Sequence, residues 1–259
     1  MLVLLAESKS MSSRQEEIAP KVFESHTPLL EEMADETMAY VASMPPLEIA
    51  ERLGISAALA TKSATMAYEF PNKSQGYPTL SAFTGDAFKG LQPSTLTSDA
   101  LESAFSRLRI ISSLYGILRP NDIIKQYRLE FNRPIAPNNL TPIKFLKPKI
   151  TVEVVKYLKL NKIKDIINLL PADADACLDW KIIRAFTKVH KICFQTISPV
   201  GTLKTPQHRM LKELRGIMCR EILENNLLSF TELCRFESRH FVFSPADSKP
   251  GLPVFISAR

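Results

Sequence analysis

The most informative stretch of the sequence is Leu114-Tyr115-Gly116-Ile117-Leu118-Arg119-Pro120. Asp122 and Tyr127-Arg128-Leu129-Glu130 follow it closely. Apolar residues at helical spacing before this stretch predict a helix over about residues 99–113. Gly116 suits a tight turn, and Arg119-Pro120-Asn121-Asp122 suit the start of a second helix. The stretch therefore predicts a hairpin between two helices, whose free backbone N–H groups can hold a phosphate. The alternative is a plain helical corner capped by Gly116.

Hydrophobic periodicity on both sides of this stretch predicts a mixture of helices and strands. Further helices are predicted over residues 28–43, 46–53, 55–69, 149–160 and 206–226. Strands are predicted over residues 2–6, 80–83, 165–170, 189–198, 239–243 and 252–256. Composition predicts loops over residues 71–78 and 132–142. Since no repeat or linker divides these segments, the sequence predicts one α/β domain over residues 1–259, or two interleaved lobes within it.

The composition and the known motifs exclude several classes of protein. Hydrophobic residues make up 45% and charged residues 23%, which suits a packed core. No apolar run approaches the ~20 residues of a membrane span, and the apolar opening over residues 1–6 is too short for a signal peptide. We therefore expect a cytoplasmic protein with no membrane association. The sequence has no HExxH, GxSxG, GxGxxG or Walker A motif, so no standard hydrolase, dehydrogenase or nucleotide triphosphatase is indicated, and no cofactor is expected.

The cysteines and histidines are scattered and match no metal-ligand spacing. We therefore expect buried, reduced thiols and no metal site. These residues are Cys177, Cys193, Cys219, Cys234, His26, His190, His208 and His240.

Charge is distributed unevenly along the chain, whose net formal charge is +6. Residues 1–60 contain four Lys and Arg against ten Asp and Glu, a balance of −6. Residues 141–220 contain sixteen Lys and Arg against six Asp and Glu, a balance of +10. This uneven distribution of charge favours a basic surface that contacts a polyanion. The alternative is an ordinary solvated, lysine-rich face.

Two groups of cations are candidates for contacts with phosphates. Arg209, Lys212 and Arg215 recur at every third position of the predicted helix over residues 206–226, so they share one face. The guanidinium groups of Arg119 and Arg128 also match phosphate geometry. A solvated helix face is the alternative for the first group. For the second group it is salt bridges to acids nearby in the sequence, Asp122 and Glu130.

A polar loop, Ser8-Lys9-Ser10, directly follows the first predicted strand. In α/β folds this is the usual place for an anion site. Together with Asp86 the loop could form a small polar pocket instead. No catalytic residue is assigned by motif, and the candidates are Lys9, Asp86, Asp173 and Lys212.

Five segments resemble, in the same order, the signature segments of the YaaA family of peroxide stress proteins. The stretch from Leu114 to Glu130 resembles the family's LYG-x-LRP-x-D…YRLE signature. Residues 2–11 resemble its first strand and Ser/Lys loop, and residues 82–91 resemble its second motif. Asn168-Leu169 resembles the strand before its acidic motif, and Lys212 with Arg215-Gly216 resembles the Lys-x-x-Arg-Gly of its late helix. The resemblance spans nearly the whole chain.

This resemblance implies a compact mixed α/β fold with a helix-hairpin-helix element and a basic cleft. It also implies DNA binding and a role in limiting oxidative damage during hydrogen peroxide stress. One motif departs from the family pattern, because Leu170-Pro171-Ala172-Asp173 stands where a small residue, a serine and two acids are expected. Only Asp173 is kept, with Asp175 as a substitute acid, so any catalysis by that motif would be weakened.

Two hypotheses about function follow. The first is a DNA-binding stress protein that contacts duplex phosphates largely without regard to sequence. The second is an enzyme that acts on a small anionic or nucleotide-like substrate in a polar pocket, to which Tyr127 also contributes. The residues expected to bind DNA or another anion are Ser8, Lys9, Ser10, Gly116, Arg119, Arg128, Arg209, Lys212 and Arg215.

Overall fold

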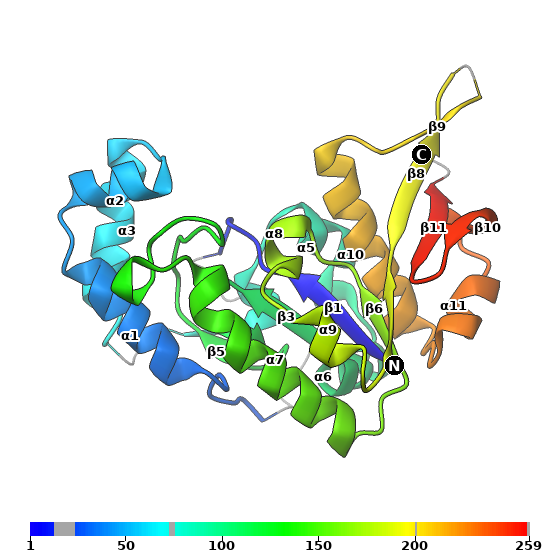
Figure 1. The fold of residues 1–259 in the computed structure, drawn as a ribbon, viewed down its shortest axis with the longest axis horizontal. Helices are drawn as coiled ribbons and strands as arrows, with labels where there is room; N and C mark the ends of the chain where they lie inside the picture. Colours follow the sequence, from blue (N-terminus) through cyan, green and yellow to red (C-terminus); the bar gives the residue numbers. More distant parts are fainter. Residues whose placement is uncertain (13–23, 73–75, 200, 258–259) are drawn as a thin grey trace.

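A computed structural model describes residues 1–12, 24–72, 76–199 and 201–257, and its centre is a five-stranded sheet (Figure 1). In spatial order the strands are β4 (Gly116–Leu118), β3 (Leu108–Ser112), β1 (Leu2–Ala6), β6 (Asp165–Asn168) and β7 (Lys188–Lys191). Strands β3, β1, β6 and β7 run parallel, and β4 pairs antiparallel with β3. The mixed α/β class and the first strand that the sequence predicts are confirmed.

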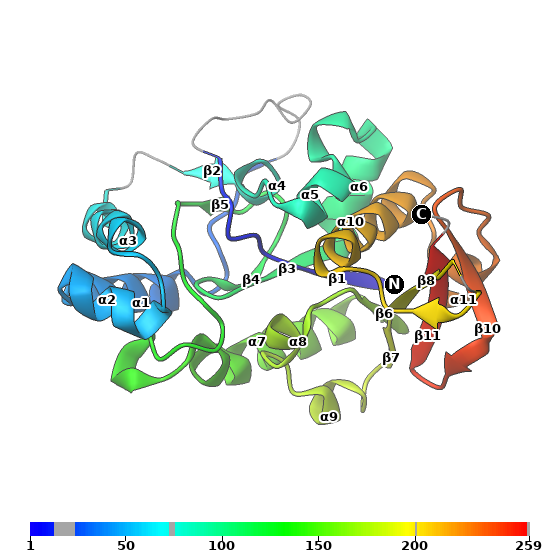
Figure 2. The same ribbon diagram turned by 90° about the horizontal axis from the view of Figure 1, so that it is seen from above.

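Helices cover both faces of this sheet (Figure 2). Side chains alternate along a strand, so Val3 and Leu5 of β1 pack into one hydrophobic cluster while Leu2 and Leu4 pack into another. The first cluster includes apolar residues of α6 (Ser98–Arg107) and α10 (His208–Glu224). The second includes those of α7 (Pro142–Leu160). Because both faces are covered, β1 is buried along its whole length.

Smaller units flank the central layers. A second sheet has the order β10 (Phe241–Lys249), β11 (Leu252–Ser257), β8 (Cys193–Ile197) and β9 (Leu203–Lys204), and α11 (Phe230–Arg235) lies beside it. At the opposite end of the molecule lie α1 (Glu31–Ala42), α2 (Pro46–Leu53) and α3 (Ala57–Glu69) (Figure 1). Strands β2 (Tyr77–Pro78) and β5 (Ile123–Ile124) form a small third sheet. The remaining short helices are α4 (Thr79–Ala82), α5 (Asp86–Leu91), η1 (Pro93–Thr95), η2 (Pro137–Asn139), α8 (Ala172–Asp175) and α9 (Trp180–Ile183).

The predicted hairpin between two helices is wrong. Helix α6 ends at Arg107, residues 108–112 form β3, and Gly116 begins β4 after a tight turn, so the stretch is a β-hairpin. The segment Leu108-Arg109-Ile110-Ile111-Ser112 pairs in parallel with β1, and this long-range pairing overrides its helical spacing. No helix begins at Arg119 or Pro120 either, since the chain turns there toward β5.

Other segments also differ from the prediction. The single strand predicted over residues 189–198 is divided into β7 and β8, which lie in different sheets, and the loop predicted over residues 71–78 ends in β2. Residues 79–82 form a helical turn, α4, in place of a strand. Helix α7 begins at Pro142, well before the predicted residue 149, because the side chain of Thr141 caps the backbone N–H of Lys144 and starts the helix upstream of Pro148. The predictions for α2 and α10 agree with the structure to within two residues at each end.

All four cysteines are free thiols. In the part of the chain that the structure describes, no helix is long and apolar enough to cross a membrane. No group of three or more His, Cys, Asp or Glu side chains among those residues is arranged to hold a metal ion.

Candidate functional site

A cavity of about 500 Å³ lies where β1 and β6 end. These strands are parallel neighbours, so the segments that follow them meet at one edge of the sheet. The wall consists of the end of β1 with residues 7–10, residues 169 and 171–173 after β6, the start of α5 with residues 84–85 before it, residues of the first turns of α10, and residues 129–131. We call this cavity the strand-end pocket.

The strand-end pocket gathers side chains from distant parts of the sequence. All four catalytic candidates line it: Lys9, Asp86, Asp173 and Lys212. Three further predicted anion-binding residues line it as well: Ser8, Ser10 and Arg215. The sequence analysis placed Ser8-Lys9-Ser10 and Asp86 in one polar pocket, and the structure brings these residues together with Asp173, Lys212 and Arg215.

Two close backbone approaches hold the pocket's walls in place. A Cβ atom on Gly216 of α10 would lie 1.8 Å from the backbone oxygen of Ala87, so α10 and α5 pack with no side chain between them at this point. On α5, a Cβ atom on Gly90 would lie 2.3 Å from the oxygen of Glu213. This tight contact fixes the start of α5, and with it Asp86, against the cationic face of α10.

Some of the charged side chains that line the pocket form ion pairs with other residues of the protein. The Lys9 ammonium lies 2.6 Å from a Glu130 oxygen. The Asp86 carboxylate lies 3.6 Å from Lys89 and 3.5 Å from Arg209, which is 79% exposed and is not part of the lining. The lining therefore contains both signs of charge, and the uniformly basic cleft that the resemblance implied is not what the structure shows.

Lys212 and Arg215 stand apart from these pairs. Within the described residues neither side chain forms a salt bridge or a hydrogen bond, and the two lie one turn apart on α10. Burial lowers the pKa of the Arg215 guanidinium, and the nearby Asp173 carboxylate partly offsets that effect. A partly buried guanidinium without an ion-pair partner is suited to accept an anionic group.

Glu7 is a pocket residue that the sequence analysis missed. One carboxylate oxygen accepts hydrogen bonds from the backbone N–H of Ser113, at 3.0 Å, and from the Tyr127 hydroxyl. The other accepts a 2.5 Å hydrogen bond from the Ser113 hydroxyl. Burial nevertheless raises the pKa of Glu7 to about 7. The sequence did offer one indication of this role, because Glu7 is an acid that directly follows a fully apolar strand.

The structure gives Gly116 and Arg119 structural roles away from the strand-end pocket. Gly116 has φ +71°, and a Cβ atom there would lie 2.8 Å from Leu30 Cδ1. Arg119 donates from its backbone N–H and its Nε to the two oxygens of the buried Asp122, and from a terminal nitrogen to the Thr27 oxygen at 2.7 Å. Arg119 therefore forms the salt bridge to Asp122 that the sequence analysis gave as the alternative to a phosphate contact.

Arg128 and Asp175 also lie outside the lining. Arg128 borders a neighbouring cavity of about 70 Å³ together with Lys9 and Tyr127, and its buried Nε has no hydrogen-bond partner among the described residues. Asp175, the substitute acid, is held by Asn168 Nδ2 at 2.6 Å and by Lys191 Nζ at 2.9 Å. Asp175 is thus a structural partner, and Asp173 is the acid of this segment that reaches the pocket.

Comparison with known proteins identifies a family that this chain matches over most of its length. The family model described as peroxide stress protein YaaA matches residues 1–247. A UPF0246 protein of Shewanella loihica is 29% identical over 266 residues, covering 99% of this chain and 98% of the relative. A UPF0246 protein of Francisella tularensis subsp. novicida is 32% identical over 212 residues, covering 80% of this chain and 82% of the relative.

Proposed function

The chain belongs to the family of the peroxide stress protein YaaA, and from this premise we propose that it binds duplex DNA through phosphates in the response to hydrogen peroxide. Such binding limits oxidative damage to DNA in the cytoplasm. It uses the shape and charge of the backbone, so it tolerates any base sequence.

One observation supports this proposal above the others. Lys212 and Arg215 both reach the strand-end pocket from α10, and no carboxylate among the described residues pairs with either. A phosphate oxygen would supply the partner that both side chains lack. Arg209, exposed on the same face of α10, extends the contact along a polyanion.

The test is the salt dependence of duplex binding, measured by fluorescence anisotropy on two duplexes of unrelated sequence. The two duplexes should bind equally, and the logarithm of the association constant should fall linearly with the logarithm of salt concentration, since phosphate contacts release counterions. An association constant independent of salt, or a strong preference for one sequence, contradicts the proposal.

A second candidate function is an enzyme that acts on a small anionic or nucleotide-like substrate in the same pocket. The Glu7 carboxyl favours this function, because a group with a pKa of about 7 in the lining of the pocket can exchange a proton near neutral pH. A thermal-shift screen of nucleotides tests it. Stabilisation by a nucleotide that Lys212→Gln abolishes would support the enzyme, and no stabilisation by any nucleotide would count against it.

A further inference from the structure

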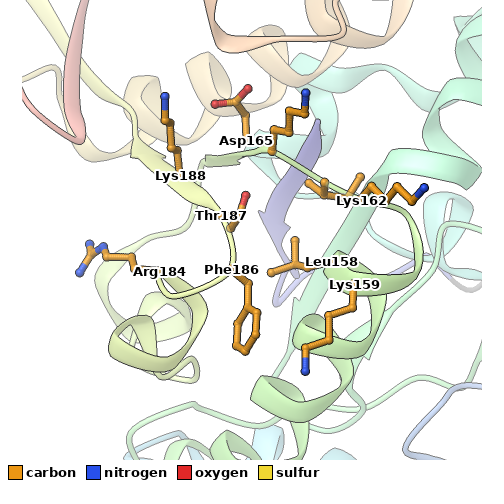
Figure 3. Close-up of a pocket in the computed structure, with 10 residues that line it drawn as sticks. Leu158, Lys159, Lys162, Asp165, Arg184, Phe186, Thr187 and Lys188 are labelled. Atoms are coloured by element: carbon orange, nitrogen blue, oxygen red, sulfur yellow. The ribbon is translucent and has the colours of Figure 1, made fainter.

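A second cationic cavity lies at the opposite end of the central sheet (Figure 3). Strand β6 runs from this cavity, where Asp165 begins it, to the strand-end pocket, which Leu169 lines. A strand of this length separates the two cavities by about 13 Å. The cavity has a volume of about 680 Å³, and we call it the strand-start pocket.

Five cations surround the strand-start pocket: Lys159, Lys162, Lys164, Arg184 and Lys188. No carboxylate in the described part of the chain forms a salt bridge with any of them. The single acid of the lining, Asp165, is already engaged by His190 at 2.8 Å. The lining therefore has five cations against one carboxylate, and a ligand bearing several negative charges would balance this excess of positive charge.

The floor of the pocket adds a hydroxyl and an aromatic ring. The Thr187 hydroxyl oxygen is buried and has no hydrogen-bond partner among the described residues. In Figure 3 it lies at the centre, and the labelled cationic side chains fan out around it. A buried hydroxyl without a partner is costly, so an incoming oxygen atom would relieve that cost.

Phe186 stays 43% exposed, although the Lys159 ammonium lies 4.6 Å from its ring centroid. An exposed ring among cations is the arrangement that binds nucleotide units, because the ring stacks on a base and the cations contact the phosphates. A plain anion such as sulfate would make no use of the ring.

We propose that the strand-start pocket binds a nucleotide unit, with its base on Phe186 and its phosphates among Lys162, Arg184 and Lys188. The nucleotide is either free or part of a single strand of nucleic acid. This site goes beyond the duplex binding proposed for the strand-end pocket, and it does not depend on that function.

The experiment uses the full chain with three probes: ATP, a short oligo-dT strand, and an abasic strand of equal length. Phe186→Ala should weaken binding of oligo-dT about tenfold and leave binding of the abasic strand unchanged, since only the former has bases to stack. Tyr68→Ala is the matched control, because Tyr68 is an exposed aromatic residue, 82% accessible, on the distant helix α3.

The double variant Lys162→Gln/Lys188→Gln tests the phosphate contacts. It should weaken binding of both strands and reduce the salt slope by about 1.4, because two phosphate contacts to a single strand are lost, whereas Lys204→Gln/Lys249→Gln, which removes the same charge from exposed positions elsewhere, should not. ATP that competes with oligo-dT identifies a free nucleotide as a ligand, and binding of oligo-dT alone identifies a strand. Either result supports the site.

Equal behaviour of Phe186→Ala and Tyr68→Ala with oligo-dT overturns the proposal, as does an unchanged salt slope in Lys162→Gln/Lys188→Gln. Duplex binding measured in parallel separates the two proposals. If duplex binding is absent while oligo-dT binding depends on Phe186, the proposed function fails and the strand-start site stands.

Discussion

Asp122 has no exposed side-chain surface, and both of its carboxylate oxygens accept hydrogen bonds from Arg119, at 2.8 Å from the backbone N–H and at 2.7 Å from Nε. Burial raises the pKa of Asp122, and the bonds and positive charge of Arg119 counter that effect. Arg119 thus favours the charged form of a buried carboxylate that follows the β3–β4 hairpin.

Replacing Arg119 should therefore affect folding. We expect Arg119→Ala to lower the free energy of unfolding by about 3 kcal/mol, because it leaves a buried carboxylate without its ion-pair partner. Urea denaturation measures this loss. Arg119→Ala/Asp122→Asn should recover part of it. A stable Arg119→Ala variant with weakened DNA binding would instead return Arg119 to the ligand-binding surface.

Gly116 should tolerate no side chain. Gly116→Ala combines a left-handed backbone, φ +71°, with a Cβ atom 2.8 Å from Leu30 and 3.1 Å from Ile150. Gly201→Ala is the matched control, since Gly201 has φ +80° and, apart from its chain neighbours, no described residue has a heavy atom within 4 Å of its Cβ position. We expect the control to cost about 1 kcal/mol from backbone strain and Gly116→Ala to cost at least about 1 kcal/mol more. Equal thermal shifts in both variants would rule out the steric clash.

The success and failure of sequence prediction at this hairpin have one physical cause. Strand β1 could be predicted because five consecutive apolar residues mark a strand buried on both faces. Residues 108–112 could not, because their spacing suits a helix and only pairing with β1, far away in the sequence, makes them a strand.

For the candidate site as well, some residues could be predicted from the sequence and others could not. Ser8, Lys9 and Asp173 follow β1 and β6, so a parallel sheet brings them to one edge. Glu7 escaped prediction because burial in the fold raises its pKa, and because its hydrogen-bond partners are Tyr127 and Ser113. Neither of these residues is near Glu7 in the sequence.

The Glu7 carboxyl should make stability depend on pH. Its pKa is about 7 in the folded chain against 4.5 as the reference value. Below pH 4.5 Glu7 is protonated in both the folded and the unfolded chain, so the free energy of unfolding does not depend on its titration. As pH rises toward the folded pKa, the unfolded state loses its proton first, so the free energy of unfolding falls, by on the order of 2 kcal/mol once partial solvent exposure is considered.

Glu7→Gln removes this titration and keeps the shape of the side chain. The free energy of unfolding of Glu7→Gln minus that of the wild type should therefore rise between pH 4.5 and about 7 and level off above it. Urea titrations of both proteins at several pH values give this difference. A constant difference across that range contradicts a raised pKa at Glu7.

The central claim is that cations of α10 hold DNA phosphates at the strand-end pocket, and the salt dependence of duplex binding by α10 variants tests it most directly. Lys212→Gln/Arg215→Gln should reduce the slope of log K against log salt by about 2, equally for unrelated sequences, because two phosphate contacts are lost. The exposed single variant Lys212→Gln should reduce it by about 1 without disturbing the fold. Lys204→Gln/Lys249→Gln should match the wild type. If the α10 variants show the same slope as this control, the claim is contradicted.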